Sequence, residues 1–267
     1  MDQNRGPGLR LMIGLVMAAF ALFSYYSFSS KNTITGEKQH ISLSKDQEIA
    51  LGLKAAPTMI HQFGGEVQDS KTSGLVDKVG NRLFERSSVR KTGYKFDFHL
   101  LADDHTINAF ALPGGQVFIT DALAKKLKTE GQLAGVLGHE MGHVAARHSA
   151  EQLAKQNLTQ GLVGAVATGS NGGESAQLAA AVASMVNLKY SRGDELEADA
   201  LGVRFMSEAG YDPHSMVSVM EVLEAASKGN KSPEFFSTHP NPEHRIPKIK
   251  AAIQKQFPNG VPQGLER

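Results

Sequence analysis

The sequence contains no cysteine and no tryptophan. Without cysteine, disulfides, thiol nucleophiles and thiolate metal sites are excluded, so a metal site must be built from histidine, aspartate and glutamate. The sequence also has almost no net charge, because it contains 28 lysines and arginines and 27 aspartates and glutamates. This balance, without any basic block, argues against a nucleic-acid partner. The 267 residues suffice for one substantial core with a small appendage.

Long apolar runs are scarce, and the clearest one lies near the N-terminus. Residues 11–28 carry no charge and follow the basic residues Arg5 and Arg10. As a helix, this run would extend about 27 Å, against roughly 30 Å for the hydrocarbon core of a bilayer. We therefore expect residues 1–30 to be a single-pass membrane anchor that leaves the rest of the chain on the extracytoplasmic side. The alternative is a signal segment cleaved near Ala19–Ala21, which would release the remainder.

The residues after this run predict a linker and then a folded domain. Residues 31–44 are polar and predict the linker, and the capping box at Ser44–Gln47 predicts the start of a helix. Alternating apolar residues predict strands in residues 94–103 and 108–120, and a Pro-Gly-Gly turn divides the second of these stretches.

The remainder of the chain has an almost wholly helical pattern. Small residues dominate 160–188 and predict a packed flap, and residues 258–267 predict a disordered tail. The folded domain is thus expected over residues 45–257. Its element order, helix, small sheet and many helices, predicts an α+β fold.

One apolar helical stretch contains two histidines and a glutamate. His139, Glu140 and His143 lie within "LAGVLGHEMGHVAARHS", although burying such groups without partners is costly. At about 3.6 residues per turn, the two imidazoles lie on one helix face and can reach the same ion. The Glu140 carboxylate can then accept a proton from metal-bound water. This HExxH pattern predicts a hydrolase with one Zn²⁺ per chain, held in part by His139 and His143, with Glu140 as the catalytic residue.

A further histidine follows in the same stretch. His148 is nine residues from His139. On one continuous helix this spacing places the two residues about half a turn apart. We therefore expect His148 to be a surface histidine outside the site.

A zinc site of this kind needs a third protein ligand and one open position. Glu195, in "SRGDELEAD", is the candidate, and Asp199 follows it by one helical turn and could accept a hydrogen bond from a ligand imidazole. The alternative is an ordinary acidic helix face, because Asp194 and Glu197 lie in the same stretch.

Four segments carry a family resemblance: "HEMGH", "YSRGDELEADALG", "AGYDP" and "STHPNPEHRI". Together they resemble the HtpX/BepA/Oma-like zinc metallopeptidases (metallopeptidase family forty-eight) over residues 45–257. The resemblance implies a zincin-like domain of the gluzincin type, in which Glu195 is the third zinc ligand and Asp199 its paired aspartate. It also implies an edge strand, at Asn108, Ala109 and Phe110, that holds an extended substrate peptide.

Two residues near the C-terminus have roles that the sequence leaves open. His239 either approaches the zinc as a latency ligand, or stabilises an oxyanion, or closes a proline-rich turn. Arg245 either pairs with the acidic site helix or polarises the scissile carbonyl.

The function predicted from these patterns is that of a zinc-dependent endopeptidase. The resemblance implies a bacterial member with a single anchor in the inner membrane, which cleaves misfolded or unassembled envelope proteins on the periplasmic side. A secreted periplasmic form is the alternative location. A membrane-tethered holdase or assembly factor on a metallopeptidase scaffold is the alternative function.

Overall fold

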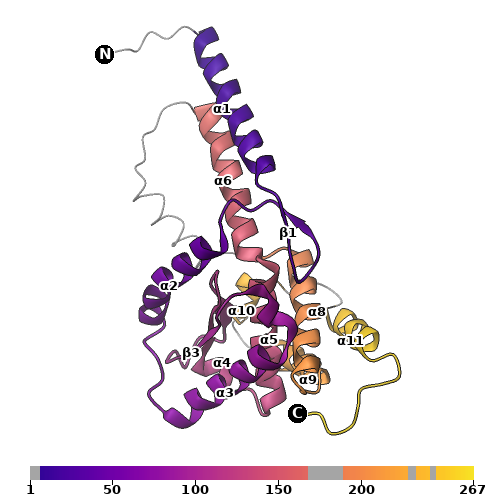
Figure 1. Ribbon diagram of the computed structural model, residues 1–267. Coiled ribbons are helices and arrows are strands. Elements are labelled where there is room, and N and C mark those ends of the chain that lie inside the picture. Colours follow the sequence, from indigo (N-terminus) through magenta and orange to yellow (C-terminus); the bar gives the residue numbers. More distant parts are fainter. Residues whose placement is uncertain (1–6, 168–188, 228–232, 241–244) are drawn as a thin grey trace.

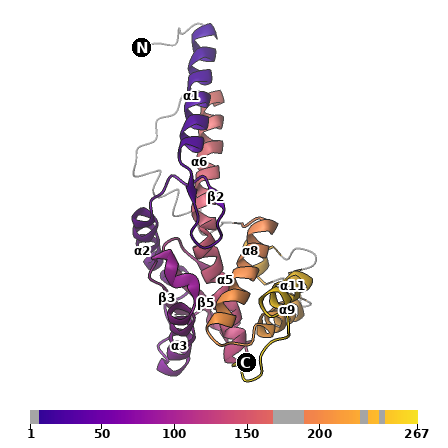
Figure 2. The same ribbon diagram turned by 45° about the vertical axis from the view of Figure 1, so that its right-hand side comes forward.

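The computed structural model describes residues 7–167, 189–227, 233–240 and 245–267. Helix α5 (Glu130–Ala146) lies at the centre of the domain and is buried from Gly131 to Ala146. A small sheet with α2 (Lys45–Gln62) and α3 (Ser70–Arg86) lies on one side of α5. Helices α8 (Arg192–Glu208), α9 (His214–Ser227) and α11 (Arg245–Gln256) lie on the other side (Figure 2). The expected mostly helical architecture with a small sheet is confirmed.

The sheet has three strands in the order β3-β5-β4, and β4 is at its edge. β3 (Asp97–Leu101) runs parallel to β5 (Gln116–Thr120), and β4 (Ala109–Ala111) runs antiparallel to β5. The predicted strands are therefore present, and β5 is buried along its full length because both faces of the sheet are covered. Val117 and Ile119 pack into the main core with α5, whereas Phe118 packs into a second cluster with α2.

Local sequence signals explain most of the helix ends. Ser44 forms the predicted capping box with Gln47 at the start of α2, and Asp69 caps α3. Ser191 forms a second capping box with Asp194 at the start of α8, whose C-terminal turn reaches Gly210 in the left-handed conformation at φ 80°. Short helices complete the described chain: α4 (Asp121–Ala124), α10 (Phe235–Thr238) and a 3₁₀ turn (Ser88–Thr92).

Two segments expected to be irregular are instead tied to the domain. The predicted linker contains a hairpin of β1 (Ser30–Lys31) and β2 (Lys38–Gln39). From this hairpin Asn32 and Gln39 donate hydrogen bonds to the last carbonyls of α5, at Ala145 and Ala146. The predicted disordered tail is also wrong, because the backbone of Glu266 bonds to Gly210 and Asp212. In both cases, buried backbone groups at a helix end need hydrogen-bond partners, and the flanking segment supplies them.

The predicted long helix through the HExxH stretch is broken in two. Arg147 adopts the left-handed conformation at φ 61°, and a new helix, α6 (His148–Ala167), starts after it. Arg147 donates hydrogen bonds to the carboxylate of Glu48, a buried residue of α2, and to the carbonyl of Leu43. These contacts offset the cost of a left-handed conformation in a residue other than glycine.

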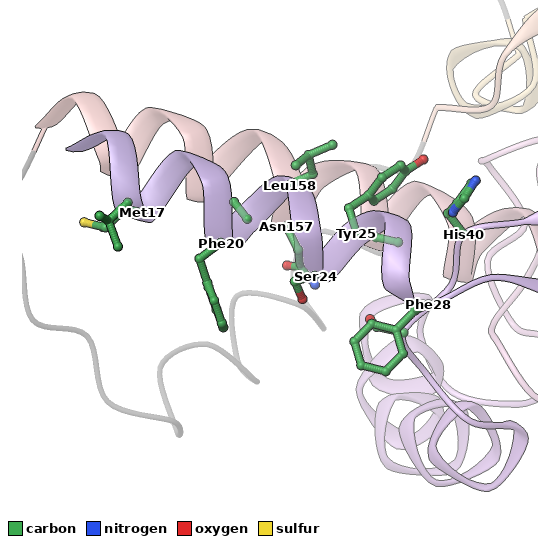
Figure 3. Close-up of a pocket in the computed structure, with 12 residues that line it drawn as sticks. Met17, Phe20, Ser24, Tyr25, Phe28, His40, Asn157 and Leu158 are labelled. Atoms are coloured by element: carbon green, nitrogen blue, oxygen red, sulfur yellow. The ribbon is translucent and has the colours of Figure 1, made fainter. Parts of the chain in front are cut away.

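Helix α6 leaves the domain beside α1 (Pro7–Ser27), and the two helices project together (Figures 1 and 2). An apolar pocket of about 470 Å³ lies between them. Its lining residues include Phe20, Tyr25 and Leu158 (Figure 3). The first part of the predicted flap thus belongs to α6, and residues 168–188 lie outside the described residues. Among the described helices, none combines the length and apolarity needed to cross a membrane, so the transmembrane prediction is not confirmed.

Helices α5 and α8 approach closely because small residues face each other. A Cβ atom on Gly142 would lie 2.7 Å from the carbonyl oxygen of Ala198 and 3.0 Å from its Cα. One turn earlier, a Cβ atom on Gly138 would meet Gly202 at 3.5 Å, an ordinary contact. The two helix backbones therefore leave no space for a side chain at Gly142, but they leave space for a methyl group at Gly138.

This difference predicts opposite effects for two matched substitutions. Gly142→Ala should lower the free energy of unfolding by about 1–3 kcal/mol, because helix backbones must separate. Gly138→Ala should leave it unchanged or raise it by about 0.5–1 kcal/mol, since alanine favours the helix. Urea unfolding followed by circular dichroism, with a chelator present throughout, measures both. Equal midpoints for the two variants would contradict the assigned contact.

Candidate metal centre

Helix α5 places the HExxH side chains at the contact with α8. His139, Glu140 and His143 are each at most 3% exposed. The Nε2 atoms of the two histidines face each other at 3.1 Å. The predicted convergence of both imidazoles on one point is thus present in the structure.

Helix α8 supplies the predicted carboxylate to the same point. Glu195 is fully buried, with Oε1 3.4 Å from the Nε2 of His143 and Oε2 3.5 Å from the Nε2 of His139. Its neighbour on the helix, Glu197, faces elsewhere and bonds to His148. The acidic residues of this stretch therefore do not form one solvated face, because Glu195 points to the candidate metal centre and Glu197 to His148.

His239 brings a fourth donor from the residue that follows α10. Its Nδ1 lies 3.2 Å from Oε1 of Glu195 and 3.4 Å from Nε2 of His139. Its Nε2 lies 3.6 Å from Oε1 of Glu140. Of the roles left open by the sequence, this position favours the latency ligand.

The spacing of the four donors is compatible with a tetrahedral metal. Ligands at about 2.0–2.2 Å from one Zn²⁺ lie roughly 3.3–3.6 Å from each other in a tetrahedron. With Oε1 as the donor of Glu195, four of the distances among the four donor atoms run from 3.1 to 3.4 Å, and all four atoms lie within 4.8 Å of one another. Two or three imidazoles with one carboxylate also match the nitrogen and oxygen chemistry of zinc sites.

The charge of the site also fits a divalent cation. The carboxylates of Glu140, Glu195 and Asp199 are buried together with one guanidinium, that of Arg245. Burial raises the pKa of Glu195, but the histidines around it outweigh this effect and leave its pKa lowered. Both carboxylate oxygens of Glu140 and the Nε2 of His239 lack a hydrogen-bond partner among the described residues. A cation among these groups would compensate their burial.

Asp199 and Arg245 orient His139 from the side of its ring that faces away from the candidate metal position. Oδ1 of Asp199 lies 2.9 Å from Nδ1 of His139, so the Nε2 of that ring is directed to the shared point. Arg245 pairs with both oxygens of Asp199, at 2.6 and 2.8 Å, and lies 3.1 Å from Glu195. Burial lowers the pKa of His139, but hydrogen bonds with Asp199 and Glu195 outweigh burial and raise the pKa to about 9. Arg245 is thus placed to pair with the site helix, one of the two roles that the sequence left open.

The prediction for His148 is wrong. This histidine is only 2% exposed, and its Nδ1 lies 2.8 Å from Nδ1 of His143. The break at Arg147 explains the difference, because the angular count along one helix does not apply across it. Tyr190 was also missed, and its ring stacks on His143 at 3.8 Å between centroids. Neither contact has a spacing signal in the sequence.

The predicted substrate strand lies at the sheet edge but is covered. Asn108 and Ala109 are 4% and 0% exposed, and Phe110 is half-buried. The backbone nitrogen of Phe235, at the start of α10, donates a hydrogen bond to the carbonyl of Ile107 beside this strand. The segment that carries His239 therefore contacts both the approach to β4 and the candidate metal centre.

The known proteins that this chain resembles are metallopeptidases, as the candidate metal centre suggests. The family model for peptidase family M48 matches residues 70–253. The mitochondrial metalloendopeptidase OMA1 of Schizosaccharomyces pombe is 31% identical over 250 residues, which cover 92% of this chain and 72% of that protein. The beta-barrel assembly-enhancing proteases of Yersinia pestis and Escherichia coli are each 30% identical, over 84% and 88% of this chain.

The extent of these matches differs between the relatives. The chain spans about half the length of the beta-barrel assembly-enhancing proteases, 47% and 49% of the two. The family model, in contrast, covers most of the chain and includes all four metal-site donors. The chain therefore belongs to peptidase family M48 and is a zinc-dependent metalloendopeptidase.

Proposed function

We propose that the chain hydrolyses peptide bonds of misfolded or unassembled cell-envelope proteins, with His139, His143 and Glu195 as zinc ligands. The observation that carries the proposal is the set of donor–donor distances of 3.1–3.5 Å in a buried, carboxylate-rich site. When bound, zinc supplies Lewis-acid chemistry, which polarises a carbonyl and lowers the pKa of water to about 7.

The residues around the candidate metal centre have two further roles, proton transfer and orientation of a ligand. Glu140 is next to a proposed ligand, and neither of its oxygens has a hydrogen-bond partner among the described residues. It accepts the proton of the attacking water and passes it to the leaving amine. Burial raises the pKa of Glu140, which brings a carboxylate closer to the range useful for a proton carrier at neutral pH. Asp199 and Arg245 keep His139 oriented throughout.

The proposed substrate is an extended polypeptide because the sheet ends at β4. Leu112 donates to Gln116, and Thr120 donates to the carbonyl of Asn108, so the alternate residues Ala109 and Ala111 direct their backbone groups to the opposite edge. An extended chain that adds a strand there would form main-chain hydrogen bonds independent of its sequence. Misfolded or unassembled proteins offer such segments, whereas folded domains rarely do.

We propose that this arrangement is a closed form of the enzyme. Glu140 and Ala109 are both 0% exposed, so neither a substrate carbonyl nor an added strand can reach them without movement. His239 would take the fourth position of a bound metal, which a catalytic zinc site keeps for water, and Phe235 stacks on its ring at 4.5 Å. We propose that the segment 233–240 is a latch that must leave before cleavage.

The proposed location is the periplasmic side of the inner membrane, and a secreted periplasmic form is the alternative. Helix α1 supports membrane association because Leu15, Phe20 and Phe23 are 63–71% exposed. Membrane fractionation of the full chain, with sequencing of its N-terminus, tests this. An intact N-terminus in the membrane fraction is expected, whereas a mature end near residue 22 in the soluble fraction would favour the alternative.

Two substitutions at the site should separate metal binding from catalysis. Glu140→Gln should keep the zinc content and lower the kcat for casein cleavage by at least about 10²-fold, since proton transfer contributes about 10²–10⁴-fold. Glu195→Gln should lose zinc together with activity, because a ligand charge is removed. Metal analysis and casein cleavage measure both, and Glu224→Gln, an exposed glutamate on α9, is the control. Zinc-loaded Glu140→Gln with undiminished cleavage would exclude this mechanism.

The latch predicts a gain of activity. His239→Ala should keep zinc, because three protein ligands remain, and should raise casein cleavage several-fold by freeing the fourth position. His214→Ala, a half-exposed histidine paired with Asp212, should leave the rate unchanged. If His239→Ala instead loses zinc, or cleaves at the wild-type rate, the latch is ruled out.

A further inference from the structure

We propose that His148 and Glu197 position the second zinc ligand, His143, and fix the tautomer in which its Nε2 is free to bind metal. This inference rests on the proposed zinc site. Nδ1 of His148 lies 2.8 Å from Nδ1 of His143, and Nε2 of His148 lies 3.0 Å from Oε2 of Glu197. The three side chains form a continuous chain of hydrogen bonds that ends at the candidate metal centre.

The directions of these hydrogen bonds follow from their end points. The Glu197 carboxylate only accepts, so His148 donates to it through Nε2–H. A neutral His148 then has a bare Nδ1, which accepts the Nδ1–H of His143. The remaining nitrogen of His143, Nε2, keeps its lone pair and faces His139 at 3.1 Å and Glu195 at 3.4 Å. One carboxylate therefore determines the tautomers of two histidines.

The break after α5 is what brings His148 to this position. Arg147 takes the left-handed conformation, and its guanidinium is held by the buried Glu48. Tyr94 donates a further hydrogen bond to the other oxygen of Glu48, at 2.9 Å. A continuous helix would direct His148 to the opposite side of α5, so the costly conformation at Arg147 serves the contact with His143.

His143 is held on its other side as well. The ring of Tyr190 stacks on it at an interplanar angle of 20°, and the hydroxyl of Tyr190 hydrogen-bonds with Ser149 at 2.8 Å. Stacking fixes the plane of the imidazole, whereas the bond from His148 fixes its rotation within that plane and its proton. The arrangement differs from that of His139, whose Nδ1 meets the Asp199 carboxylate directly.

Three substitutions of His148 test its contact with His143 and its contact with Glu197 separately. In asparagine, Oδ1 lies near the place of the imidazole Nδ1 and can accept from His143, but the side chain is too short for Glu197. Glutamine can reach Glu197 but places no acceptor at the position of Nδ1. Leucine removes both contacts. His99→Gln, in a histidine that contacts Glu66 and Gln116 on the sheet, is the matched control.

The measurement is the rate at which full-length, zinc-loaded protein releases zinc to a chelator, together with the unfolding midpoint of each metal-free variant. His148→Gln and His148→Leu should release zinc roughly 10–100-fold faster, the range typical for loss of a partner behind a metal ligand. His148→Asn should stay within about threefold of wild type. His99→Gln should match wild type. Nitrogen NMR of the wild-type imidazoles should find the proton of His148 on Nε2.

Each outcome bears on the proposal in a defined way. Slow release by His148→Asn with fast release by His148→Gln supports positioning through Nδ1, even if His148→Leu fails to fold. The proposal is overturned if all variants retain zinc as wild type does, if release follows the loss of metal-free stability alone, or if the proton of His148 lies on Nδ1. A wild-type chain that holds no zinc would instead remove the proposed function itself.

Discussion

The close contact between α5 and α8 is the constraint on which the site depends. Gly142 lies against the backbone of Ala198, and this close spacing lets donors from the two helices lie 3.4–3.5 Å apart. The contact places three buried carboxylates beside one guanidinium, a combination that a folded protein rarely tolerates without a cation. Metal binding and folding are thus coupled here, since the ion compensates charges that packing alone leaves uncompensated.

The surrounding structure orients the donors from outside the helix pair. Arg245, from α11, fixes Asp199 and through it His139. Glu48, from α2, fixes Arg147 and through it the start of α6 with His148. Elements on opposite sides of α5 therefore orient His139 and His143, the two histidines of the candidate metal centre.

Sequence reasoning was reliable wherever the relevant residues share one helix. His139 and His143 lie within α5, and Glu195 and Asp199 lie within α8, so helical spacing alone places each pair correctly. It was wrong for His148 because Arg147, an ordinary helix former by propensity, is held in the left-handed conformation by a tertiary ion pair. Contacts such as these, between residues far apart in the chain, have no local signal.

In the proposed mechanism, the position of His239 couples substrate access to the candidate metal centre. Its Nδ1 completes the set of four donors, its Nε2 lies 3.6 Å from Glu140, and its segment contacts the carbonyl of Ile107 beside β4. We propose that an extended chain that adds to β4 and a carbonyl that approaches Glu140 would both displace this segment. Because a ligand shifts an equilibrium only by its differential affinity for the two states, a polypeptide that binds only the open form would shift the proposed latch toward release.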